Sequence, residues 1–355
     1  MSGARPFEIH IPDTALADLH DRLVRTRWPD DASSDVRRLV ERWRDDFDWR
    51  AREATINQFA NYSTDVDGRR LHFVHECADG DARCALILTH GWPSSFLEYL
   101  RLVPLLTASG FDVVVPSLPG YAWSDPLPHG EFHRVPELWV RLMTDVLGYE
   151  RFGAYGGDIG GMVTNRLARE HPERLLGIHV SFLAEPHVEG PLSAVERAFL
   201  AARPEGLEEA GAYAHVQRTR PQTLAVALED SPAGLAAWIG DKWYEWSERV
   251  DEDTLLATLT LYWVTRSISS SFRPYVEWKL AGASPAGLEL EPGERIEVPT
   301  AVALFSIARW PREWAERAYS DLRRWTEMAR GGHFGALEAP ELLAEELRAF
   351  FGSLR

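Results

Sequence analysis

One short stretch decides how the rest of the sequence is interpreted: Tyr155-Gly156-Gly157-Asp158-Ile159-Gly160-Gly161. It joins an apolar run that predicts a buried strand, residues 152–155, to a segment that predicts a helix. Glycines on both sides of a central residue allow the sharp strand-to-helix turn that exposes a nucleophile in one class of α/β enzymes. The central side chain is the carboxylate of Asp158. The stretch therefore predicts an aspartate nucleophile where a serine hydrolase has a hydroxyl.

Two other interpretations of this turn stay open. Glycine-rich turns before helices also bind phosphates, but the spacing Gly-x-Gly-x-x-Gly is absent and the Asp158 carboxylate would repel a phosphate. The glycines could also serve only to shape the turn.

Apolar runs alternate with helical segments on both sides of this turn. Such alternation is typical of a parallel sheet that is buried on both faces. The expected strands are 85–88, 111–115, 152–155, 178–182, 298–305 and 325–328, and the expected helices between and after them are 95–108, 135–147, 311–319 and 339–351. The sequence predicts an α/β fold with a mostly parallel, doubly wound sheet.

Two segments fall outside this alternation. Residues 186–295 indicate helices rich in aromatic side chains, which predicts an inserted cap between two parts of the core, 81–185 and 296–355. Residues 1–80 predict an extension packed on the core. In it we expect a short strand over 7–11, a helix from Asp13, helices over 34–44 and 48–57, and a hairpin at Asp67-Gly68.

The composition restricts the partners and the compartment. The net charge of −16 disfavours nucleic acid and anionic membranes. Two cysteines, Cys77 and Cys84, are too few for a disulfide framework and lack metal-ligand spacing. No apolar run approaches the roughly 18 residues of a membrane span, and the first residues lack the apolar block of a signal peptide. We expect a cytoplasmic protein without metal or cofactor.

Two further motifs stand where this kind of enzyme needs them. His90-Gly91-Trp92-Pro93-Ser94 follows the strand 85–88, a place where the backbone N–H of Trp92, with that of Ile159, could stabilise an oxyanion. Arg330-Gly331-Gly332-His333-Phe334 follows the last expected strand. The chain order nucleophile, acid, histidine makes His333 the candidate general base.

An aspartate nucleophile restricts the substrate. A carboxylate that attacks a saturated carbon displaces a leaving group and forms an ester, so epoxides and alkyl halides are the candidate substrates. Water deprotonated by His333 would then cleave the ester. An epoxide oxygen leaves as a basic alkoxide and needs a proton donor such as tyrosine. The cap offers Tyr213 and Tyr275, although spacing alone does not distinguish them among the ten tyrosines.

The sequence resembles the epoxide hydrolases of the microsomal and juvenile-hormone type along nearly its whole length. The resemblance is carried by residues 6–28, 90–94, 156–158, 213–221, 231–238, 262–263 and 331–334. It implies an α/β-hydrolase fold, Asp158 as nucleophile, His333 as base, and Tyr213 with Tyr275 as the pair that binds and protonates the epoxide oxygen. It also implies a small epoxide and water as reactants, and a homo-oligomer is an open alternative to a monomer.

One departure from the family concerns the acid that orients the histidine. The family carries a carboxylate in the loop before Pro-Arg-Glu-Trp, but residues 305–310 contain none. Glu185, which follows the strand 178–182, is the candidate replacement, and a solvated loop glutamate is the alternative. Three other functions remain open: an epoxide-opening cyclase, a haloalkane dehalogenase, although Ile159 replaces its usual halide-binding Trp, and an inactive ligand-binding homologue.

Overall fold

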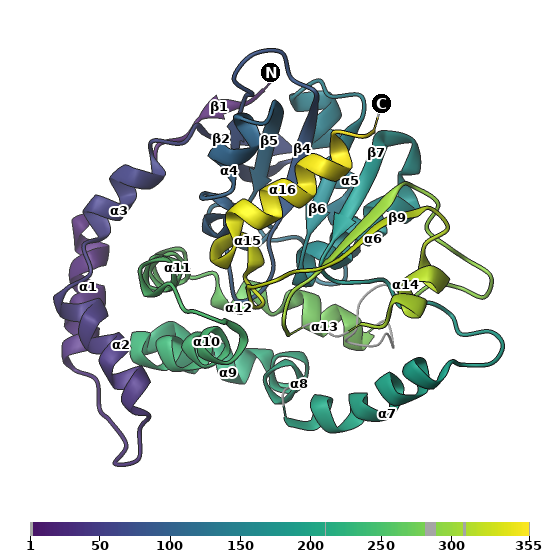
Figure 1. Cartoon of the computed structure of the whole chain (residues 1–355). Coiled ribbons are helices and arrows are strands. Elements are labelled where there is room, and N and C mark those ends of the chain that lie inside the picture. Colours follow the sequence, from purple (N-terminus) through teal and green to yellow (C-terminus); the bar gives the residue numbers. More distant parts are fainter. Residues whose placement is uncertain (1–2, 210, 281–288, 308–309, 355) are drawn as a thin grey trace.

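A nine-stranded sheet forms the centre of the computed structural model, which describes residues 3–209, 211–280, 289–307 and 310–354 (Figure 1). The strand order is β1-β2-β3-β5-β4-β6-β7-β8-β9. Pairing is antiparallel from β1 to β3 and between β3 and β5, and parallel from β5 onward. The strands are β1 (Arg5–Pro6), β2 (Asn61–Val66), β3 (Arg69–Glu76), β4 (Cys84–Thr89), β5 (Phe111–Pro116), β6 (Phe152–Gly156), β7 (Leu175–Val180), β8 (Thr300–Leu304) and β9 (Leu322–Glu327). This confirms the predicted mostly parallel sheet.

Helices cover both faces of the parallel strands, which explains why these strands are unbroken apolar runs. Successive side chains of a strand point to opposite faces. Leu86 and Leu88 of β4 pack with α4 (Val103–Thr107) and α16 (Pro340–Phe351). Ile87 belongs instead to the core that includes α5 (Val135–Arg141) and α6 (Asp158–Glu170). Figure 1 shows α16 crossing one face of the sheet.

The cap is inserted between β7 and β8 and lies beyond one end of the sheet (Figure 1). It consists of α7 (Ala194–Glu209), α8 (Ala212–Thr219), α9 (Pro221–Asp230), α10 (Pro232–Trp246), α11 (Glu252–Thr265), α12 (Ile268–Ser271) and α13 (Arg273–Leu280). Trp92, which follows β4, contacts Tyr213 of α8 and Tyr275 of α13. The cap therefore covers the carboxyl end of the central strands, the edge where α/β enzymes place their sites.

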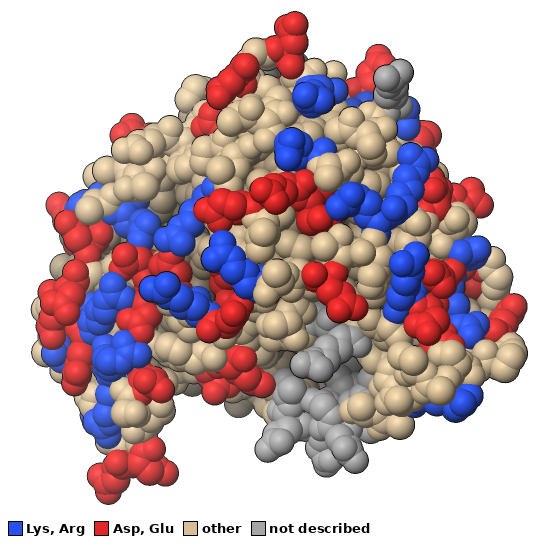
Figure 2. All heavy atoms as spheres, viewed as in Figure 1, with Lys and Arg blue, Asp and Glu red and all other residues tan. Residues whose placement is uncertain are grey.

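The N-terminal extension contacts both the sheet and the cap. Its strand β1 pairs with β2, and its helices are α1 (Asp13–Val24), α2 (Ser34–Asp45) and α3 (Trp49–Ile56). The Trp43 indole N–H donates to the Thr260 hydroxyl of α11 at 3.0 Å, and Arg42 pairs with Glu252 at 2.8 Å. On the face that Figure 2 shows, acidic and basic side chains are interspersed.

The strand predicted over residues 7–11 is wrong. Strand pairing with β2 ends at Pro6, with one further hydrogen bond from the Phe7 N–H to the Asn61 carbonyl at 2.9 Å. Beyond Phe7 the backbone binds a side chain of α3 and that of the residue after it. The Ile9 N–H donates to Asn57 Oδ1 at 2.9 Å, and the Ile11 N–H donates to Glu53 Oε1 at 2.7 Å. Ile9 and Ile11 are both buried, although neither belongs to a strand. The alternation of apolar residues therefore reflects an extended segment that packs beside α3.

Two predicted helices differ in detail from the structure. The helix expected over 95–108 is divided into a 3₁₀ turn, η1 (Phe96–Tyr99), and α4, which begins just before Pro104 because proline cannot donate a hydrogen bond within a helix. The helix expected over 135–147 widens after α5 into a π turn, η3 (Leu142–Val146). No helix in the described residues is both long and apolar enough to cross a membrane.

Candidate active site

Asp158 lies on a tight turn between β6 and α6. Its backbone has φ 49°, a left-handed conformation that is costly for a residue other than glycine. Helix α6 can turn back on the sheet only because the glycines near Asp158 have no side chains. A Cβ on Gly160 would lie 1.8 Å from the Thr89 carbonyl oxygen, and one on Gly156 would lie 2.2 Å from the Gly160 oxygen. The glycines thus fix the exposed position of the carboxylate.

A backbone N–H contacts one oxygen of this carboxylate. The Trp92 N–H donates to Asp158 Oδ1 at 2.8 Å. Ile159 is in the first turn of α6, where N–H groups have no partner within the helix and the helix dipole favours negative charge. A Cβ on Gly91 would lie 2.3 Å from the same oxygen, so the chain approaches the carboxylate closely. Of the two amides named from the sequence, that of Trp92 therefore contacts the Asp158 carboxylate, and that of Ile159 follows Asp158 directly in the chain.

His333 is located in the loop between β9 and α15 (Gly335–Glu338), on the other side of the carboxylate. Its Nε2 is 3.7 Å from Asp158 Oδ2. Burial lowers the pKa of the His333 imidazole, and the charges of Asp158 and Glu338 oppose that effect. A neutral imidazole at this place can accept a proton from a water molecule at Asp158.

The two cap tyrosines lie together above the turn. The Tyr213 ring stacks on that of Trp92 with centroids 5.0 Å apart, and the Tyr275 ring lies 6.0 Å from that of Tyr213. Burial raises the pKa of both hydroxyls, and a hydrogen bond joins the two side chains. Both hydroxyls therefore stay protonated at neutral pH and can donate hydrogen bonds to a substrate oxygen.

A cation lies beside Tyr213. Lys242 of α10 has its Nζ 5.5 Å from the centroid of the Tyr213 ring and 5.8 Å from that of Trp246. Its ammonium also pairs with Asp241 at 3.0 Å. Such a cation–π contact favours one orientation of the tyrosine ring.

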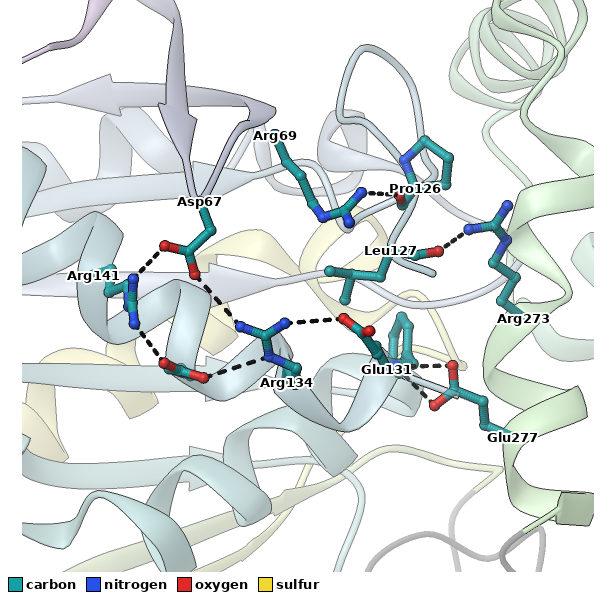
Figure 3. A network of polar contacts seen from close by, with 11 residues as sticks. Asp67, Arg69, Pro126, Leu127, Glu131, Arg134, Arg141, Arg273 and Glu277 are labelled. Carbon is teal, nitrogen blue, oxygen red and sulfur yellow. Dashed lines mark hydrogen bonds and ion pairs between the residues drawn. The ribbon is translucent and has the colours of Figure 1, made fainter. Parts of the chain in front are cut away.

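The helix that carries Tyr275 is tied to the core on both sides of that residue (Figure 3). Both Glu277 carboxylate oxygens accept from the Phe132 N–H, at 2.8 and 2.7 Å, and the Arg273 guanidinium donates to the Leu127 carbonyl. These hydrogen bonds fix the position of α13, and therefore of Tyr275, relative to the core.

The structure does not bring Glu185 to His333. Glu185 pairs through its backbone with Glu289 and Leu290, and its charge acts on the Tyr319 hydroxyl. In the part of the chain that the structure describes, Asp158 is the carboxylate within ion-pair distance of the His333 ring. The assignment of Glu185 as the orienting acid is therefore corrected: β7 directs the residue toward the segment before β8.

Sequence reasoning missed a different carboxylate, Glu338. It lies at the end of α15, and its charge acts on the His333 imidazole. Its place five residues after the histidine in the chain was the available signal. Glu98 also lies near Asp158 and Glu338, but burial raises its pKa to about 8. Glu98 is therefore mostly uncharged at pH 7.

No group of three or more His, Cys, Asp or Glu side chains suited to a metal ion occurs among the described residues.

Comparisons with known proteins assign this chain to one family. The family described as epoxide hydrolase N terminus matches residues 4–99, and the alpha/beta hydrolase fold matches residues 85–217. A Stigmatella aurantiaca protein named as an epoxide hydrolase is 40% identical and covers 99% of this chain and 86% of its own length. Epoxide hydrolase 1 of Sus scrofa is 30% identical, covering 99% of this chain and 89% of its own length.

A solved structure gives the same result. The Aspergillus niger epoxide hydrolase superimposes with a TM-score of 0.85 at 30% identity, over 100% of this chain and 97% of that chain. The sequence matches and this superposition extend over the extension, the core and the cap. The chain belongs to the epoxide hydrolase family, within the α/β-hydrolase fold.

Proposed function

We propose that this protein opens an apolar or aromatic epoxide to a vicinal diol through a covalent ester on Asp158. The observation that carries the proposal is the position of the Asp158 carboxylate. Oδ1 accepts a backbone hydrogen bond from Trp92 at 2.8 Å, while Oδ2 lies 3.7 Å from His333 Nε2. One oxygen is thus held by the backbone and the other is placed to attack.

In the first step, Asp158 Oδ2 forms a bond to a ring carbon as the carbon–oxygen bond of the epoxide breaks. The ring oxygen takes a proton from Tyr213 or Tyr275. The pair supports an epoxide over an alkyl halide, because a halide leaves as a stable anion and needs no proton. Aromatic rings surround the pair, with Trp246 5.2 Å from Tyr213, which supports an apolar substrate.

In the second step, His333 takes a proton from water, and the water oxygen bonds to the carboxyl carbon of Asp158. The negative charge develops on Oδ1, where the Trp92 and Ile159 amides stabilise it. The ester bond then breaks, and the departing alkoxide receives a proton from the imidazolium. The carboxyl group keeps the second proton of the water and passes it back to the tyrosinate, so that the aspartate and the tyrosine are both restored. The diol carries one oxygen that came from the carboxylate.

Trapping the ester tests this proposal. In His333→Gln, we expect turnover of an aryl epoxide to fall by about 10³-fold, within the range for a lost general base, while the ester accumulates. Intact-mass measurement should show protein heavier by one epoxide mass, and peptide mapping should place it on Asp158. Asp158→Asn in the same background is the matched control and should form no ester.

Three outcomes would contradict the proposal. Absence of the adduct in folded His333→Gln protein would exclude the covalent ester. Adduct formation with a haloalkane but with no epoxide would indicate a dehalogenase. Binding of the epoxide with no turnover by the unaltered protein would indicate a ligand-binding homologue.

A further inference from the structure

A loop of the cap and the loop that carries His333 are joined by a reciprocal pair of glutamates. Glu248 lies in the cap loop between α10 and α11. Its carboxylate accepts from the Gly331 N–H in the loop between β9 and α15, residues 328–334, which carries His333 and is called the base loop below. Glu338, at the end of the base loop's helix, accepts from the N–H of Glu248 at 2.7 Å and of Arg249 at 3.0 Å. Each loop therefore supplies one carboxylate to backbone amides of the other.

The backbones of the two loops also touch at His333 itself. The His333 N–H donates to the Trp246 carbonyl at 2.8 Å, and the two rings lie 4.8 Å apart. A Cβ on Gly332 would lie 2.3 Å from the Trp246 oxygen and 2.7 Å from the Glu248 nitrogen. The base loop thus fits against the cap because position 332 lacks a side chain.

Glu338 both binds the cap loop and acts electrostatically on the His333 imidazole. Its other oxygen accepts from the Phe334 N–H, next to His333, at 3.3 Å. The charged groups that act on the imidazole are Asp158 and Glu338, and both favour its protonated form. Glu98, which faces both of them, is mostly protonated at pH 7. The loop after β8, where the family carries its orienting acid, has no carboxylate.

We infer that Glu338 is a positioning residue for ester hydrolysis: it holds the His333 loop against the cap and stabilises the imidazolium that forms when His333 takes a proton from water. This inference rests on the proposed covalent mechanism. Glu338 acts on the second step, in which water is deprotonated and the ester bond breaks. It has no part in the first step, where the carboxylate of Asp158 attacks and a tyrosine supplies the proton.

Single-turnover kinetics of Glu338→Gln with an aryl epoxide test this role. Glutamine keeps the size of the side chain but removes the charge. Ester hydrolysis should slow by about 10- to 100-fold, as expected for the loss of one charge that favours the transition state, with ester formation changed by less than about twofold. The acid limb of the hydrolysis rate should move to lower pH, because removal of a nearby negative charge lowers the pKa of His333.

Glu248→Gln is the matched control. It alters the other carboxylate of the same pair, which binds Gly331 and is not one of the charges acting on His333. We expect its acid limb to stay where it is in the unaltered protein. Glu338→Asp, which restores the charge on a shorter side chain, should return the acid limb toward its original position even where the rate stays low.

The outcomes separate this inference from the proposed function. If His333→Gln forms no ester, the covalent mechanism fails. If His333→Gln forms the ester and Glu338→Gln hydrolyses it at the original rate, or slows both steps equally without moving the acid limb, the mechanism stands and the role of Glu338 is wrong. Urea unfolding of each variant verifies that it is folded.

Discussion

The turn that carries Asp158 and the loop that carries His333 meet at one carboxylate, but different parts of the molecule hold them. Asp158 is fixed by the core, where glycines allow α6 to touch the end of β4. His333 is fixed by the cap, through the Trp246 carbonyl and the glutamate pair. The position of the proposed nucleophile therefore depends on short-range packing within the core, whereas that of the proposed base depends on contact between two separate segments. This difference explains how the base can keep its place although the loop after β8 lacks a carboxylate.

The largest expected effect comes from disrupting the contact between α6 and β4 that fixes Asp158. Gly160→Ala would put a Cβ 1.8 Å from the Thr89 oxygen, a backbone atom that cannot move without shifting β4. We expect the variant to lose more than about 4 kcal/mol of unfolding free energy, or to fail to fold. Urea unfolding followed by fluorescence measures it.

Gly157→Ala is the control in the same turn. Its Cβ would meet Ser181 Cβ at 3.7 Å, an ordinary contact, and Gly157 has φ −114°. We expect a change of less than about 1 kcal/mol. Equal stabilities of the two alanine variants would show that the α6–β4 contact does not hold the turn.

A smaller effect on stability is expected from disrupting the contact between the His333 loop and the cap. Gly332→Ala would put a Cβ 2.3 Å from the Trp246 oxygen and so separate the base loop from the cap. The sheet is not involved, so we expect a folded protein in which ester hydrolysis is about 100-fold slower, as for a misplaced catalytic group. Quenched-flow measurement of the ester should show its formation nearly unchanged.

Gly240→Ala in α10 provides a comparison within the cap. Its Cβ would approach the flexible end of Leu39 at 3.3 Å and meet the Tyr244 ring at 3.8 Å, an ordinary contact. Hydrolysis should proceed as in the unaltered protein. A loss in Gly240→Ala as large as in Gly332→Ala would mean that any disturbance of α10 reaches the base, and the specific contact at position 332 would lose its significance.

The smallest effect on turnover is expected from replacing His179, a buried histidine of the sheet, which should alter how stability depends on pH. His179 of β7 lies 5.6 Å from Tyr155 in the strand that leads to Asp158, and burial lowers its pKa from 6.5 to about 3. As the pH falls from 6.5 toward 3, the unfolded chain binds this proton and the folded chain does not, so stability is lost.

We therefore expect His179→Phe to reduce the loss of unfolding free energy between pH 7 and pH 5 by about 2 kcal/mol. Turnover at pH 7 should be nearly unchanged, because the side chain is remote from the reacting atoms. Urea unfolding at the two pH values measures the difference. Parallel pH curves for the variant and the unaltered protein would show that His179 is not kept neutral by the fold.

Sequence patterns predicted the parts of this protein that depend on local chemistry. Unbroken apolar runs located the parallel strands, and the glycines around Asp158 located the turn. Asp67-Gly68 predicted the β2–β3 hairpin, in which both residues have positive φ. In each case a few neighbouring residues determine the local backbone, so the pattern is sufficient.

The errors arose where distant segments decide the outcome. Residues 7–11 alternate like a strand, but the N–H groups of Ile9 and Ile11 bind the side chains of Asn57 and Glu53. Glu185 has the right place in the chain for an orienting acid, yet β7 directs it toward Leu290. Glu338 lacks any motif of its own, because its effect on His333 depends on how the cap folds back on the base loop.

The N-terminal extension connects the sheet to the cap. Its first residues are part of the sheet through β1, and its helix α2 packs on α10 and pairs with α11 through Arg42. One continuous segment therefore extends from the sheet to the helices of the cap (Figure 1). Relatives with a longer or shorter segment between β1 and α2 should accept epoxides of correspondingly different bulk.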